Sequence, residues 1–106
     1  MKSHDFITIA RSILEADARA RERAADEASD HVGTYTSAQT SALATLLAAT
    51  AAAEKDNSAL EAELHAINEL TSTGHVDLNH LSPLHEIVLN DIPSQLREYV
   101  SDLLEG

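Results

Sequence analysis

Three side chains that could hold a metal ion follow one another at four-residue steps: Glu61, His65 and Glu69. On an α-helix this spacing puts them on one face, where two carboxylates and an imidazole could bind a divalent cation with a fourth ligand from elsewhere. A solvated helix face on which Glu and His lie together by chance is the better explanation of the pattern. A histidine ligand is normally held by a further hydrogen-bond partner, and the sequence indicates none. We therefore expect no metal site and no cofactor, and keep a His/carboxylate metal-binding protein as a third alternative for function.

The remaining polar residues show no catalytic pattern. His75, His80 and His85 are five residues apart, which turns successive side chains by about 140° on an ideal helix, so they cannot share one face. The three glycines are isolated, and the chain has no Gly-rich phosphate loop, GxSxG or HExxH motif. The absence of cysteine excludes disulfides, thiolate chemistry and Cys-based metal sites. We expect that the protein is not an enzyme.

Net charge is the most informative global property. The 106 residues carry a formal charge of −11, from 18 acidic side chains against 7 lysines and arginines. Within residues 37–106 the only bases are Lys55 and Arg97, so the negative field is concentrated in the C-terminal two thirds. Binding to a phosphate backbone requires clustered Lys and Arg on one face. We therefore expect no direct nucleic-acid binding, and we expect a basic protein surface to be steered toward this chain.

The N-terminus and the apolar stretches predict a cytoplasmic, soluble protein. The sequence MKSHDFITIA lacks the apolar region of a secretory signal, because Asp5 interrupts it. The longest apolar stretch, 42–53, is shorter than the roughly 20 residues that a membrane span needs. No membrane association is expected.

The hydrophobic pattern predicts an all-α fold of three to four helices in a single domain, 1–106. Apolar and polar residues never alternate strictly over more than a few positions, so no strand is expected. Caps are indicated at Thr36 or Ser37, Ser82 and Asp91, and a stop at Gly74. The predicted helices are an N-terminal helix 4–28, a long central helix 37–72, and two short helices, 83–90 and 92–105.

The N-terminal helix is expected to be apolar only in its first half. Its second half, EADARARERAADEASD, contains alanine and charge, and reads as a solvated helix. Opposite charges lie four residues apart there, which predicts three ion pairs within this helix. The pairs are Glu15 with Arg19, Asp17 with Arg21, and Arg23 with Glu27.

The central segment carries a heptad pattern. Its positions alternate by three and four residues from Leu43 to Thr71 without a break, which favours one continuous helix across Asp56-Asn57-Ser58. Such a seam predicts pairing with a second copy, with Asn57 as the polar position that fixes register. The expected self-association residues are Leu46, Asn57, Leu60, Leu64 and Ile67.

Charge, size and the absence of catalytic motifs favour a small acidic protein-binding module. The most consistent function is an inhibitor or regulator of the nucleic-acid-mimic, immunity or mobile-element-inhibitor type, which occupies the basic surface of a partner such as a nucleic-acid-handling protein. The alternative is a self-associating structural or adaptor protein, and a homo-oligomer fits both functions. The expected partner-binding residues are the acids without an internal partner and one aromatic residue: Glu61, Glu63, Glu69, Asp77, Glu86, Asp91, Glu98, Asp102 and Tyr99.

Overall fold

The computed structural model describes residues 1–106 and contains helices and connecting turns but no strand. The predicted all-α class is confirmed, whereas the predicted number of three to four helices is too low. There are five α-helices, one nine-residue 3-10 helix and two single 3-10 turns. In chain order these are α1 (Ser3–Ile13), α2 (Ala18–Asp30), η1 (Val32–Thr34), α3 (Ser37–Ala53), α4 (Asn57–Thr71), η2 (Leu78–Glu86), η3 (Leu89–Asp91) and α5 (Ser94–Glu105).

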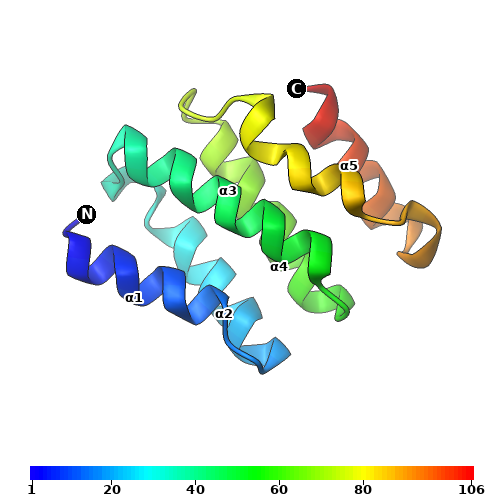
Figure 1. Cartoon of the computed structure of the whole chain (residues 1–106), viewed down its shortest axis with the longest axis horizontal. Coiled ribbons are helices and arrows are strands. Elements are labelled where there is room, and N and C mark those ends of the chain that lie inside the picture. Colours follow the sequence, from blue (N-terminus) through cyan, green and yellow to red (C-terminus); the bar gives the residue numbers. More distant parts are fainter.

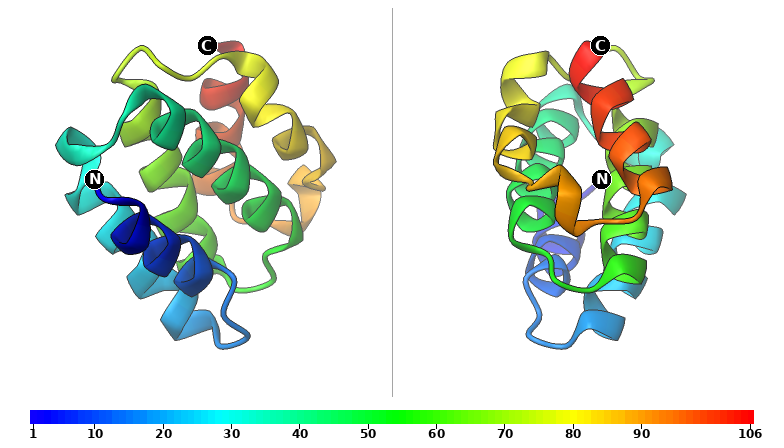
Figure 2. Two further views of the ribbon diagram at one scale, coloured as in Figure 1. Left: turned by 60° about the vertical axis from the view of Figure 1, so that its left-hand side comes forward. Right: turned by 90° about the vertical axis from the view of Figure 1, so that its right-hand side faces the viewer.

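The six longer elements form three helical hairpins arranged side by side. In Figure 1, α1, α3 and η2 make the front layer, and α2, α4 and α5 lie behind them. The edge-on view in Figure 2 shows the same two layers, which agrees with principal dimensions of 39 × 30 × 18 Å. Each front helix is followed in the chain by the rear helix that packs on it. None of the helices has the length and apolar composition needed to cross a membrane.

The predicted N-terminal helix 4–28 is wrong, because the chain turns back on itself after Ile13. Asp17 has an extended backbone, and its carboxylate accepts a hydrogen bond from the Ala20 N–H at 2.9 Å, so it caps a new helix. The break lets the apolar face of α1 and the alanine face of α2 pack against each other. A single helix could not bury both faces in the same core.

The predicted continuous helix 37–72 is also wrong, and the chain reverses at Glu54-Lys55-Asp56. Asp56 is extended, and its carboxylate accepts a hydrogen bond from the Ala59 N–H at 2.9 Å, which caps α4. The other ends of this hairpin follow the predicted signals. Thr36 and Gln39 form a reciprocal capping box at the start of α3, and Gly74, with a φ of 84°, follows the end of α4.

The last two predicted helices, 83–90 and 92–105, are shifted. The first is a 3-10 helix, η2, which begins at Leu78 and contains Pro83. Proline lacks an N–H and its ring clashes with the carbonyl four residues earlier, so this segment does not continue as an α-helix. The second begins at Ser94, directly after Pro93, whose carbonyl accepts hydrogen bonds from the Leu96 and Arg97 N–H groups at 3.0 Å. Proline fits a helix start, because an N–H at that position would have no partner within the helix.

Small residues make a large part of the core between the rear helices. Ala24, Ala25 and Ala28 of α2 are buried although this segment reads as solvated, and they form part of the same core cluster as the leucines of α3 and α4. The distance between helix axes depends on the side chains at the contact, so alanine allows close packing. Alanine in this chain is therefore a core residue, which explains how few large apolar residues α2 needs.

Candidate functional site

Helices α4 and α5 place a tyrosine among acidic side chains on the rear layer. The Tyr99 hydroxyl lies 3.4 Å from His65 Nδ1, and His65 Nε2 lies 3.6 Å from a carboxylate oxygen of Glu69. Glu61 stands one turn before His65 and is exposed. On α5, Glu98 and Asp102 flank Tyr99 and are exposed as well. We call these six residues the acidic α4–α5 face.

Electrostatics at this face favour cation binding over catalysis. Burial raises the pKa of Tyr99, and the negative charges of Glu69 and Glu61 raise it further. The order Tyr, His, Glu is that of a nucleophile, its base and an orienting carboxylate, but an activated phenol needs a lowered pKa. A half-buried aromatic ring beside carboxylates instead offers a cation both ring and charge contacts.

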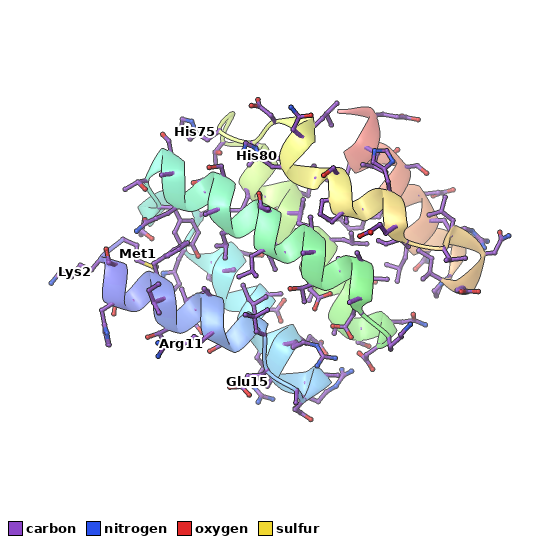
Figure 3. The ribbon with its side chains drawn as sticks, in the orientation of Figure 1. Met1, Lys2, Arg11, Glu15, His75 and His80 are labelled. Atoms are coloured by element: carbon purple, nitrogen blue, oxygen red, sulfur yellow. The ribbon has the colours of Figure 1, made fainter.

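The side chains of the acidic face are spread over its surface and are not grouped as metal ligands. The side chains of His65 and Glu69 are about half exposed, and nowhere in the chain are three His, Cys, Asp or Glu side chains arranged to hold a metal ion. The other histidines considered from sequence lie elsewhere. Figure 3 shows His75 in the loop after α4 and His80 on η2, at the end of the molecule opposite Glu15.

Three exposed acids of the predicted partner-binding set lie outside the acidic α4–α5 face. Asp77 precedes η2, and its backbone N–H donates to His80 Nδ1 at 2.9 Å. Glu86 and Asp91 are exposed beside a separate pocket of about 260 Å³ between the α3–α4 turn and η3. The structure therefore brings Glu61 and Glu69 of α4 close to Tyr99, and Glu98 and Asp102 lie on the same helix as Tyr99.

Glu63 was expected at the partner-binding surface, and this is wrong, because its side chain is completely buried. It lies on the face of α4 that carries Leu60, Ile67 and Leu70, all of which are also buried. Neither of its carboxyl oxygens has a hydrogen-bond partner. Burial and the neighbouring Glu54 raise the pKa of Glu63 to about 9, so it is neutral at pH 7.

An ion pair of a partly exposed arginine and a buried carboxylate lies beside Glu63. The Nε and one terminal nitrogen of Arg21 each donate to the Glu54 carboxylate at 2.8 Å, in a two-point contact. The Glu54 side chain is fully buried, and burial alone would raise its pKa. Arg21 and the hydrogen bonds at the turn outweigh that effect and lower the pKa of Glu54 to about 2.

The ion pairs on α2 differ from the predicted i,i+4 pairs. Arg19 contacts Glu22 and Asp56, and Arg21 contacts Glu54. Two arginines of α2 therefore connect this helix to the α3–α4 turn. The predicted partner of Arg21, Asp17, is instead the cap of α2.

The positions expected to mediate self-association have other surroundings. Leu60, Leu64 and Ile67 belong to the core of the chain itself, and Leu46 is half-buried at the edge of a groove. Asn57 is exposed in the first turn of α4. Because α3 and α4 fold back on each other, the continuous seam on which the expectation depended does not exist.

The Arg21–Glu54–Glu63 cluster is the feature that the sequence interpretation missed. A signal was present, since Leu60, Glu63, Ile67 and Leu70 follow three- and four-residue steps and therefore share a helix face. The heptad interpretation took Leu64 as part of the buried stripe, which put Glu63 at the edge of that stripe.

No protein-family model, no curated protein and no solved structure matches this chain.

Proposed function

We propose that this protein is an acidic binding module that occupies a basic surface of a partner protein and thereby inhibits or regulates it. The observation that supports the proposal is the acidic α4–α5 face. Tyr99 lies among carboxylates of two helices that the fold holds in a fixed relative position. Tyrosine is a frequent anchor residue at protein interfaces, and surrounding charges set partner choice and association rate.

The chemistry of the face specifies what the partner presents. A lysine or arginine side chain placed over the Tyr99 ring would also reach the carboxylates of Glu61 and Glu69, whose charges act on Tyr99. A protein that handles nucleic acid displays such cations in clusters, because they bind phosphates. The face supports this class of partner better than a direct contact with nucleic acid, which the same charges repel.

The salt dependence of binding tests the electrostatic part of the proposal. The protein is immobilised, incubated with extract from its native host, and washed at low and at high salt before the bound proteins are identified. The screening length falls from about 10 Å at 0.1 M to about 3 Å at 1 M salt, so a partner held by charge is released by the second wash. Recovery of no basic protein in a salt-sensitive complex would contradict the proposal.

Matched charge reversals then locate the contact. With the identified partner, Glu61→Lys and Tyr99→Ala are expected to weaken binding at least tenfold, chiefly through slower association for the charge reversal. Asp26→Lys is the control, because Asp26 is an exposed acid on α2, away from Tyr99, and the change in net charge is the same. Equal effects of Glu61→Lys and Asp26→Lys would show that net charge, and not this face, governs association.

A further inference from the structure

Glu63 is the one buried side chain whose polar atoms have no partner. The charged groups that face it are Glu54 from the α3–α4 turn, Arg21 from α2 and Asp56 from the start of α4. A carboxylate only accepts hydrogen bonds, so ionised Glu63 could not bond to Glu54, although the two carboxyl groups are within hydrogen-bonding reach. A protonated Glu63 carries an O–H and can donate.

The hydrogen bonds of Glu54 leave one of its oxygens able to accept this proton. Its Oε2 accepts from three groups, a terminal nitrogen of Arg21 and the backbone N–H groups of Lys55 and Asp56. Its Oε1 accepts only from Arg21 Nε, which leaves one lone pair. The O–H of Glu63 therefore has a free acceptor on Glu54 Oε1.

Charge balance requires the same proton. Arg21 supplies one positive charge, and ionised Glu54 supplies one negative charge. A second buried carboxylate would leave the cluster with an uncompensated negative charge in a low-dielectric interior, which is strongly unfavourable. One shared proton makes the group of Arg21, Glu54 and Glu63 electrically neutral.

We propose that Glu63 and Glu54 share one proton and that, with Arg21, they form a latch that joins α4, the α3–α4 turn and the α1–α2 loop. Arg21 extends the latch to that loop, because another of its nitrogens donates to the backbone carbonyls of Glu15 and Ala16 at 2.9 and 2.7 Å. The raised pKa of Glu63 and the lowered pKa of Glu54 agree with this arrangement. This latch is a separate site from the acidic α4–α5 face.

Loss of the proton has a defined structural consequence. Arg21 and Glu54 line one end of a groove of about 400 Å³, whose walls include Ile13, Leu46 and the α1–α2 loop residue Glu15. When Glu63 ionises, its charge competes with Glu54 for Arg21, and the turn and the loop lose a common anchor. The groove is then expected to open at this end.

Side-chain titration by NMR tests the latch on the full-length chain. With ¹³C-labelled glutamate, the Glu63 carboxyl carbon is expected to titrate at least about two pH units above that of Glu61, an exposed residue on the same helix. The backbone amides of Lys55 and Asp56 donate to Glu54. As pH rises through the same range, their hydrogen exchange with solvent is expected to become faster by more than the increase that unprotected amides show. A Glu63 midpoint equal to that of Glu61 would overturn the proposal.

The Glu63→Gln variant separates the latch from a merely buried residue. Its carboxamide N–H can donate to Glu54 at any pH, so the pH-linked increase in Lys55 and Asp56 exchange is expected to disappear, while Glu61→Gln is expected to leave it unchanged. An unchanged increase in Glu63→Gln would show that another group controls the turn. If this variant does not fold, the wild-type titration alone decides.

Discussion

Replacing Glu63 by glutamine is expected to stabilise the protein at neutral pH, although it alters a fully buried residue. The change keeps the shape of the side chain, and the carboxamide can donate the proposed hydrogen bond to Glu54. It removes the need to hold a proton that the unfolded chain releases. The stability difference therefore depends on pH, with a sign fixed by the pKa of Glu63 in the folded state.

The sign follows from proton linkage. The pKa of Glu63 is raised from 4.5 to about 9 on folding, so its contribution to stability is full below pH 4.5 and is lost as pH rises toward 9. Between pH 4.5 and pH 7 this residue lowers the free energy of unfolding of the wild type by up to about 3 kcal/mol, at about 1.4 kcal/mol per pH unit. Small domains have a total stability of about 5–15 kcal/mol, so the effect is easily measured.

Glu54 shapes the acidic side of the same profile. Its pKa is lowered from 4.5 to about 2, so its contribution is present above pH 4.5 and is lost as pH falls toward 2. The two carboxyl groups together give wild type a contribution that is greatest near pH 4.5. In Glu63→Gln the loss of stability above pH 4.5 should be absent.

Urea denaturation followed by circular dichroism between pH 4 and pH 9 measures this difference. Glu63→Gln is expected to be more stable than wild type at pH 7, with the gap increasing up to pH 9. Glu61→Gln, an exposed substitution on the same helix, should follow the wild-type profile. Parallel profiles for wild type and Glu63→Gln would refute the assignment of a retained proton.

Three further substitutions test the packing, the ion pairs and a turn. Arg21→Ala is expected to lower the urea midpoint more than Arg19→Ala, because Arg21 holds the buried Glu54 carboxylate whereas the pairs of Arg19 are exposed; equal midpoints would contradict this. Leu64→Ala is expected to cost about 2–5 kcal/mol of stability, since Leu64 packs in the core of its own chain, and light scattering is expected to show a monomer; stability that depends on protein concentration would instead indicate pairing of copies. Gly74→Ala is expected to cost about 1 kcal/mol because of its positive φ, while Gly33→Ala, which has no such conformation and equally open surroundings, should be nearly neutral in thermal melts.

The sequence predicts the fold class correctly and the chain reversals incorrectly, for an identifiable reason. Three- and four-residue spacing reports that one side of a helix is buried, but not whether another copy or the next helix covers it. At Asp56 the predicted spacing runs across the reversal, but after Leu43 it does not follow the buried side of α3, which carries Leu47 and Ala51 instead. The Asp56 carboxylate is the local sign of the break, as is Asp17 before α2.

The candidate sites differ in how much the sequence could show. Exposed acids and Tyr99 are visible as residue types, and the structure adds that Glu61 and Glu69 lie near Tyr99. The latch joins residues 33 positions apart, Arg21 and Glu54, and no local pattern connects them. Burial of Glu63 depends on α2 covering that side of α4, which is a tertiary property.

The arrangement of three consecutive hairpins has a consequence for how this chain folds. The helices of each hairpin are neighbours in sequence, and the second hairpin packs on both the first and the third. The contacts within each hairpin can form after closing a short loop, whereas the most extensive packing, α2 on α4 and α3 on η2, joins one hairpin to the next. The central hairpin, α3 and α4, is the only one that the other two both need. We expect it to form early and to provide the surface on which the terminal hairpins complete the structure.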